Sequence, residues 1–289
     1  MSAGGETSSG GGELFELLEA GFPGIGWGAR LARMEALGVE WERVSKPFVR
    51  YEAGRAVSHV GVMPLPLVVA GERVNAGAIH AVCTRAEARR RGHYRATLED
   101  ALRYCDARFE TLVLTTAQPE LYEPFGFRHV GEHRFGLAVG SEGARGGFRE
   151  LRPAEAEDLS ILRRLLEGRP AVSRVVGVEG EVAVFAFNET FRPLLYADEL
   201  DVIVSAEFEG ATLHLFDVVG RAACAVGDIL ERAPRLVERV VCYFSPDLLA
   251  GAEGALPEPH LLDGDDHLMV RGPFAAAGRA FMLPRTARC

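Results

Sequence analysis

A strand, an amphipathic helix and a second strand follow one another within the first half of this chain. Residues 74–83 and 111–116 are short runs rich in apolar and β-branched side chains, which predicts two strands. Between them, over 93–108, apolar residues recur at helical spacing at Leu98, Leu102 and Cys105. A helix in this position serves as the crossover between two strands of one sheet. The unit predicts an α/β fold.

Similar patterns predict the other elements. In the first half, helices over 13–20 and 27–37 precede strands over 48–53 and 56–63, and a helical turn covers 121–125. In the second half we expect a helix over 153–166, strands over 175–187, 201–207 and 211–219, a helix over 224–232 and a strand over 237–244. The second half repeats the order of the first in outline, without any repeat of residues. A duplicated fold is therefore an open alternative.

Glycines divide the chain. Residues 140–147 contain four glycines in eight positions, which is typical of a linker. We expect one domain over 13–139 and a second over 148–289. Residues 1–12 are almost entirely Gly, Ser, Ala and Thr, and they have neither the basic nor the apolar region of a signal peptide. We expect them to form a disordered tail.

Charge and cysteine content exclude several functional classes. The net charge of −9 argues against nucleic acid as a partner, because phosphate binding needs a basic surface. The five cysteines are dispersed without metal-ligand spacing, which favours reduced thiols and a cytoplasmic location. The longest apolar run, 60–70, contains two prolines and cannot form a membrane-spanning helix, so no membrane is expected as a partner. The acidic turn over 263–267 is typical of a solvated loop, and no metal is expected.

The segment between the first strand and the helix favours an anion. A strand ending near Thr84 is followed by a basic turn and then by the start of a helix, whose free N–H groups and dipole attract negative charge. Gly92 allows a ligand to approach the backbone closely. The turn is rich in arginines: Arg85, Arg89, Arg90, Arg91 and Arg95. The alternative is a solvated basic run that opens a surface helix.

Two motifs carry a resemblance to a known family. The pattern Arg89-x-x-Gly92-x-Tyr94 resembles the pyrophosphate-binding motif Arg/Gln-x-x-Gly-x-Gly/Ala of the GNAT superfamily of N-acetyltransferases, with Tyr94 in place of the small last residue. Tyr122-x-x-x-Gly-Phe127 is similar to a segment that follows it in the family. The wider stretch looks like the acetyltransferase part of enhanced intracellular survival proteins. The resemblance covers about 50–135 well.

The resemblance implies a fold and a cofactor site. It implies a GNAT-like mixed central sheet with flanking helices, and here two tandem GNAT-like domains of which the second is degenerate. Acetyl-CoA would be the co-substrate. Its pantetheine arm would lie along Val82, Cys83 and Thr84, with the Val82 N–H stabilising the oxyanion. The remaining cofactor-binding residues would be Arg89, Arg90, Arg91, Gly92, His93, Tyr94, Arg95 and Gln118.

Tyr122 would be the general acid that protonates the departing thiolate, and the alternative is a core aromatic with a satisfied hydroxyl group. The general base is less clear, since Ala78 stands where many relatives have a glutamate. By strand alternation His80 projects on the same face as Ala78 and Val82, so it is one candidate, with a structural histidine as the alternative. In the enhanced intracellular survival proteins the base is the terminal carboxylate. That makes the main-chain carboxylate of Cys289, at the end of an apolar stretch expected to be a strand over 281–289, a second candidate.

These features predict an acetyl-CoA-dependent N-acetyltransferase acting on a primary amine of a small molecule or peptide, in a ternary complex. A non-catalytic acyl-CoA-binding sensor is the alternative. The acidic balance of the chain favours a cationic acceptor through steering. The second half is expected to wall the acceptor pocket and to support homo-oligomers.

Overall fold

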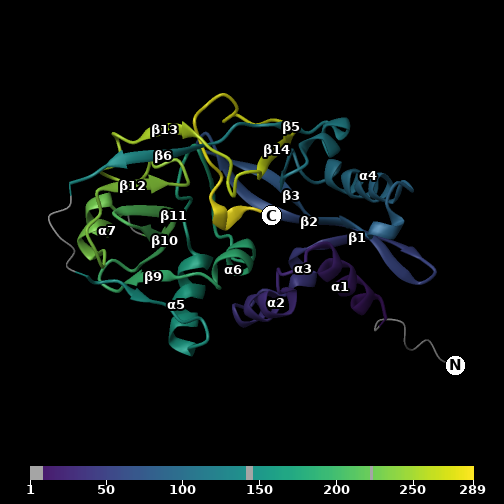
Figure 1. Ribbon diagram of the computed structural model, residues 1–289, viewed down its shortest axis with the longest axis horizontal. Coiled ribbons are helices and arrows are strands. Elements are labelled where there is room, and N and C mark those ends of the chain that lie inside the picture. The colour runs from purple at the N-terminus through teal and green to yellow at the C-terminus, as the bar shows by residue number, and fades with distance from the viewer. Residues whose placement is uncertain (1–8, 141–145, 222–223) are drawn as a thin grey trace.

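A computed structural model describes residues 9–140, 146–221 and 224–289. Two sheets lie side by side, and the C-terminal segment runs between them (Figure 1). Helices α1 (Ser9–Gly21), α2 (Trp27–Ala36) and α3 (Trp41–Val44) pack beside the first sheet. Helix α1 begins four residues before the predicted start at Glu13, so the end of the predicted tail is helical. The rest of that tail and most of the predicted linker lie outside the described residues.

The first sheet contains the predicted strand–helix–strand unit. Strands β3 (Glu72–Thr84) and β4 (Thr111–Thr116) are parallel, and α4 (His93–Asp106) connects them. The sheet has the order β1-β2-β3-β4-β14-β5. The other strands are β1 (Lys46–Glu52), β2 (Arg55–Val69), β5 (Arg128–His129) and β14 (His267–Arg271). The predicted α/β class is therefore confirmed.

Strand β2 extends beyond its predicted end at Met63. It runs through Pro64 and Pro66, which cannot donate to a ladder. This is possible because β1 pairs with β2 only as far as Val62, so neither proline has to donate to β1, and beyond that point Pro66 only accepts, from the Glu179 N–H at 3.1 Å. Strand β8 (Val176–Val178) then pairs with the end of β2.

The second sheet has the order β13-β6-β12-β11-β10-β9-β7. Its strands are β6 (His133–Ala138), β7 (Arg149–Glu150), β9 (Leu194–Ala197), β10 (Val202–Glu209), β11 (Thr212–Gly220), β12 (Arg239–Cys242) and β13 (Leu256–Pro259). The helices of this half are α5 (Ala156–Glu167), α6 (Ala183–Glu189) and α7 (Val226–Arg232).

The predicted strand over 175–187 is wrong in its second part, which forms α6. The buried Glu181 carboxylate accepts the Val184 N–H at 2.8 Å and the Phe185 N–H at 3.1 Å. It thereby satisfies two N–H groups that have no partner in the first turn of a helix. The helix is apolar on nearly all sides and is packed into the core, so its sequence has no amphipathic period.

The two sheets share one order of strands and exchange one strand each. Strand β6 of the first half lies next to β12 in the second sheet, whereas β14 of the second half lies next to β4 in the first sheet. Each sheet has one parallel pair joined through a helix, β3 with β4 and β11 with β12. The order of elements supports the expected duplication. The sheets do not divide at the predicted linker.

The C-terminal segment is buried between the sheets and is not the predicted strand. It contains a short 3-10 helix, η4 (Arg285–Ala287). Buried carboxylates from both halves bind its polar side chains: Glu189 contacts Arg285 at 2.8 Å, Asp217 accepts the Thr286 hydroxyl and Glu132 pairs with Arg288. These side chains need partners on several sides, which an edge strand could not give them.

We expect removal of the Asp217 charge to destabilise the fold strongly, because it would leave a buried cation without its partner. Asp217 is fully buried and lies 3.0 Å from the guanidinium of Arg169, whose side chain is also buried. In Asp217→Asn this cation loses its nearest counter-charge, which should lower the free energy of unfolding by on the order of 3 kcal/mol. Urea unfolding measures the change.

Glu40→Gln is the matched control, because Glu40 pairs with Arg43 at 2.7 Å on the surface. It should change the same quantity by less than about 1 kcal/mol. Equal losses in the two variants would contradict the assigned role of Asp217.

Candidate active site

The parallel pair β3 and β4 diverges, and the main cavity lies in the divergence. Ladder pairing joins only Ala76–Ala78 to Thr111–Val113. Beyond it, residues 79–84 and 114–116 line opposite sides of a cavity of about 720 Å³. Of the predicted site residues, the lining includes His80, Val82, Cys83, Thr84, Arg89, Tyr94, Gln118, Tyr122 and Cys289.

A β-bulge turns the backbone of β3 at this cavity. His80 pairs with Gly61 and Cys83 with His59, so Ala81 and Val82 together oppose one residue of β2. Ala81 has a φ of 50°, and its carbonyl accepts a hydrogen bond of 2.7 Å from Nδ1 of the buried His59. The bulge also breaks strand alternation. Val82 packs in the cluster that contains Ile79 and not with Ala78, contrary to the expected shared face.

The turn before α4 presents backbone N–H groups. Arg90 and Gly92 have φ values of 61° and 84°, in the left-handed region. Gly92 is followed by His93, the first residue of α4, and a left-handed residue next to a right-handed one is a backbone arrangement that can form a concave group of N–H donors. Gly92 is the N-cap of α4, and no side chain caps the helix there. A Cβ at Gly92 would meet nothing within 4 Å among the described atoms, so the backbone is open to a ligand.

The basic side chains of this turn have different partners. Arg89 lines the cavity, and its Nε donates to the carbonyl of Thr84 at 3.3 Å. Arg91 and His93 contact the same carboxylate, Glu52, at 2.7 Å and 2.9 Å. Arg95 lies over the ring of Phe125 at 5.2 Å. Arg90, Arg91, Gly92, His93 and Arg95 do not line the cavity.

Tyr94 explains how the chain tolerates a large residue in the first motif. Its hydroxyl donates to the carbonyl of Leu121 at 2.8 Å, and its ring lies edge-on to Tyr122 at 6.1 Å. Tyr94 therefore holds the segment that carries Tyr122. Burial raises the pKa of Tyr122 to about 12, so its hydroxyl stays protonated at neutral pH. Tyr122 also belongs to an apolar cluster of the core.

His80 is buried and neutral. Its Nε2 lies 3.0 Å from the hydroxyl of Ser45, and its ring lies edge-on to Trp41 at 5.1 Å. Burial lowers the pKa of His80 to about 3, with a further contribution from His59. A side chain at Gly61 would overlap the imidazole, so the glycine makes room for it. With this low basicity His80 is a weak proton acceptor.

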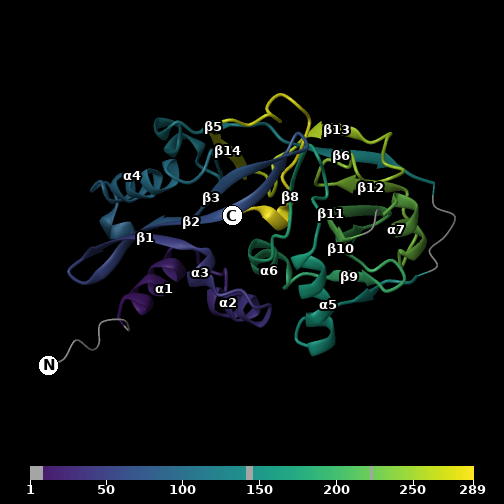
Figure 2. The ribbon, with the colours of Figure 1, turned by 180° about the vertical axis from the view of Figure 1, so that it is seen from behind.

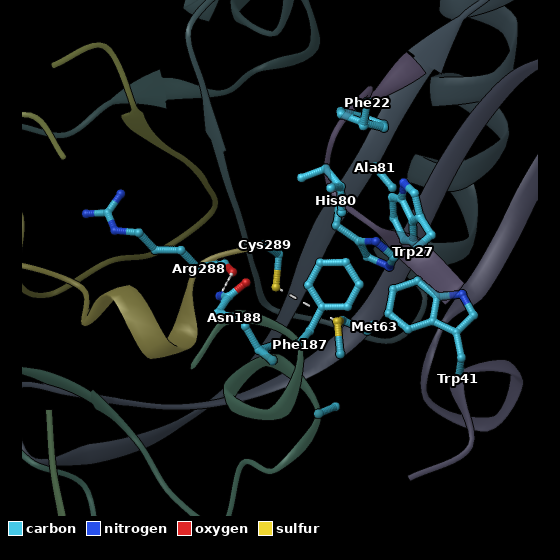
Figure 3. A pocket seen from close by; sticks show the side chains of 13 residues that line it. Phe22, Trp27, Trp41, Met63, His80, Ala81, Phe187, Asn188, Arg288 and Cys289 are labelled. Atoms are coloured by element: carbon cyan, nitrogen blue, oxygen red, sulfur yellow. Dashed lines mark hydrogen bonds between the residues drawn. The ribbon is translucent and has the colours of Figure 1, made fainter. Parts of the chain in front are cut away.

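Cys289 lies beside the diverging strands (Figure 3). Its main-chain oxygen accepts a hydrogen bond of 3.1 Å from the hydroxyl of Thr115 on β4. Asn188 on α6 donates to the carbonyl of Arg288 at 2.8 Å. The end of the segment is thus held from both halves of the chain.

Sequence comparison identifies the family of the first half. Residues 17–130 match the model of the acetyltransferase (GNAT) domain. This part of the chain is a GNAT acetyltransferase domain. No curated protein matches the chain.

Solved structures share the fold over most of the chain. A conserved protein from Enterococcus faecalis V583, named as a probable N-acyltransferase, has 16% identity and a TM-score of 0.59, over 90% of this chain and 69% of its own. Eis1 from Mycobacterium abscessus has 14% identity and a TM-score of 0.56, over 92% and 72%. A GCN5-related N-acetyltransferase from Anabaena variabilis has 17% identity and a TM-score of 0.54, over 92% and 71%.

A second cavity adjoins the first. It has a volume of about 210 Å³, and both cavities are lined by Phe22, His80, Ala81 and Cys289. Its aromatic walls come from Trp27, Trp41 and Phe187 on three different helices (Figure 3). These three aromatic residues were not predicted from the sequence as part of the site, and neither were His59 and Thr115. No spacing in the sequence relates them, because they meet only in the folded chain.

Within residues 9–140, 146–221 and 224–289, no group of three or more His, Cys, Asp or Glu side chains is arranged to hold a metal ion. Asp266, in the acidic turn, pairs with Arg288 at 3.0 Å. No helix in the described part of the chain is long and apolar enough to cross a membrane.

We expect His80 to make stability depend on pH. Its pKa is about 3 in the folded chain and 6.5 in the unfolded chain, so acid favours unfolding. The contribution of the neutral His80 to the free energy of unfolding is fully present above the pKa of the unfolded chain, 6.5. It is lost as the pH falls below 6.5 toward the folded pKa of about 3. One pH unit below 6.5, the free energy of unfolding should have fallen by about 1.4 kcal/mol.

Urea unfolding at a series of pH values measures this effect. His80→Gln should have a flatter pH dependence than the wild type, because the buried imidazole that must take up a proton on unfolding is removed. Parallel curves for the wild type and His80→Gln would contradict the prediction.

Proposed function

We propose that this chain transfers the acetyl group of acetyl-CoA to a primary amine of a small molecule or peptide, by direct attack within a ternary complex. One observation carries the proposal. The cavity between β3 and β4 collects residues from both GNAT-like motifs and from the C-terminal segment, and it adjoins a second cavity. Two adjoining cavities suit a reaction in which both substrates are bound together.

Acetyl-CoA would bind in the first cavity. The pyrophosphate would bind the N–H groups of the turn from Arg90 to Arg95, with the charge of Arg89 beside it. The pantetheine arm would follow Val82, Cys83 and Thr84 as an added strand, on the side where β4 diverges. Gln118 lines the same cavity and would contact the cofactor.

The reaction needs an oxyanion donor and an acid. The amine nitrogen attacks the thioester carbonyl, and the backbone N–H of Val82, in the bulge, would stabilise the oxyanion. The C–S bond then breaks, and the thiolate of coenzyme A takes a proton from Tyr122. With a pKa raised to about 12, the Tyr122 hydroxyl is protonated at neutral pH but is a weaker acid than an exposed tyrosine, so its role as donor rests on its position in the cavity.

Where the chain ends at Cys289, the main-chain carboxylate of this residue is the proposed base, directly or through water. Cys289 lines both cavities, and the Thr115 hydroxyl donates to its main-chain oxygen at 3.1 Å. His80 lines the same two cavities, but the low pKa of His80 makes it a poor acceptor for the proton of an ammonium ion. We therefore assign His80 to the wall of the site. The homo-oligomer and the cytoplasmic location stay predictions.

Release of free thiol tests the proposal against an acyl-CoA sensor. Purified protein is incubated with acetyl-CoA and a panel of primary amines, and the thiol of coenzyme A is followed over time. Amine-dependent release supports transfer. Tight binding of acetyl-CoA without release with any amine would favour the sensor.

Gly92→Val should raise the KM for acetyl-CoA by about tenfold or more. A branched side chain at this N-cap would occupy the open space over the N–H groups. Gly54→Val is the matched control, because Gly54 has a similar φ of 79° and equally open space, in the turn between β1 and β2. An unchanged KM in Gly92→Val would move the pyrophosphate elsewhere.

Tyr122→Phe should lower kcat by about 10²-fold or more and leave the affinity for acetyl-CoA nearly intact, because only the proton donor is removed. Steady-state kinetics separates the two quantities. Tyr104→Phe is the control, since Tyr104 lies on α4 and does not line the cavity. Equal losses of binding and turnover in Tyr122→Phe would instead identify a packing residue.

Cys289→Ala should stay active, whereas residues appended after Cys289 should reduce turnover by about 10²-fold or more. The first variant keeps the main-chain carboxylate, while the extension replaces it with an amide. The same residues appended before Met1 control for extension as such. Normal turnover by the C-terminally extended protein would exclude this base.

A further inference from the structure

The second cavity has apolar and aromatic walls. It opens beside His80, Ala81 and Cys289, where the acetyl group would be presented. The rings of Trp27 and Trp41 lie 5.2 Å and 6.0 Å from the ring of Phe187 (Figure 3). Aliphatic and other apolar walls come from Ile25, Met63, Ala183 and Val184.

From this cavity we infer that the acceptor is a primary amine on a small apolar body of about one ring, such as an arylalkylamine. The inference rests on the proposed transfer reaction and specifies its second substrate. A cavity of about 210 Å³ is slightly larger than the roughly 150 Å³ of an apolar cavity that binds benzene. It is smaller than the pockets of about 300–1,000 Å³ that hold drug-sized ligands.

Charge in the walls supports an apolar acceptor and not a polycation. Among the described residues, those that line this cavity include no Asp or Glu. Arg288 contributes to the lining, but its guanidinium is paired with Glu132 and Asp266. A second ammonium group in the cavity would lose its hydration without gaining a counter-charge. This inference differs from the expectation of a cationic acceptor that the acidic balance of the chain favours.

The same walls favour the reactive form of the amine. Apolar surroundings disfavour the charged form of a buried group, so the pKa of a bound ammonium falls. Only the neutral amine has the lone pair that attacks the thioester. The aromatic faces are also suited to edge-to-face or offset contacts with a ring of the acceptor.

Two tryptophans make the inference testable without turnover. Trp27 and Trp41 are the only tryptophans of the sequence, and both line this cavity. Tryptophan fluorescence therefore reports its occupancy. Phenethylamine should change the fluorescence saturably, and putrescine, an amine of similar length with a second charge, should bind at least about tenfold more weakly. The thiol assay should show the same preference in kcat/KM.

Two variants separate the cavity from the surface. Phe187→Leu removes one aromatic wall and should weaken phenethylamine binding about tenfold. Phe191→Leu is the matched control, because Phe191 follows α6, is 48% exposed and does not line the cavity. It should leave binding unchanged.

The outcomes distinguish this inference from the proposed reaction. Saturable binding of phenethylamine without thiol release would support the inferred binding site for an apolar amine and would contradict the proposed transfer reaction. Thiol release with putrescine at equal or greater kcat/KM would keep the transfer reaction and overturn the inference. Absence of any saturable response to phenethylamine would also overturn it.

Discussion

The short parallel pairing between β3 and β4 is the constraint on which the site depends. Because the ladder ends at Ala78 and Val113, the strands must separate, and the space between them becomes the main cavity. The bulge at Ala81, held by His59, then turns the backbone of β3 at that space. Strand β14 pairs with the other edge of β4 as far as Thr116, beyond the point where β4 leaves β3. The proposed acetyl-transfer site is thus a consequence of where hydrogen bonding between two strands stops.

The second sheet has the same order of strands, but its equivalent position is filled. Its parallel pair runs from Thr212 with Arg239 to Leu215 with Cys242, and Phe216 forms a bulge in β11. There the C-terminal segment packs against β11, with the guanidinium of Arg285 at 3.4 Å from the centre of the Phe216 ring and Thr286 donating to Asp217. In the first sheet the space where the parallel strands separate is therefore a cavity. In the second sheet the equivalent position is occupied by the C-terminal segment, which is bound there. Buried ion pairs of this kind cost desolvation, and they specify one position of the segment more than they stabilise the fold.

Features that depend on residues close together in the sequence could be predicted, whereas features that depend on contacts between distant residues could not. The strand–helix–strand unit and both motifs are local patterns, and the structure brings Arg89, Tyr94 and Tyr122 to one cavity. The exchange of β6 and β14 could not be predicted, because each strand fits an apolar sheet position in either half. The prolines of β2 and the capping of α6 by Glu181 were also missed, since both depend on a neighbour. The walls formed by Trp27, Trp41 and Phe187 come from helices far apart in the sequence, so no periodicity relates them.

The two cavities also suggest how one site can manage a difficult proton transfer. A free carboxylate is a weak base for an ammonium ion, because their ordinary pKa values lie several units apart. Apolar surroundings move both values in the useful direction, since burial disfavours the charged form of each group. At Cys289, the walls that would hold the apolar part of the amine are also those that surround the proposed base. Selection of the acceptor and its deprotonation would then have a single physical origin, the removal of water from one small cavity. A polar acceptor that kept water in this cavity would bind more weakly and would also be deprotonated less readily.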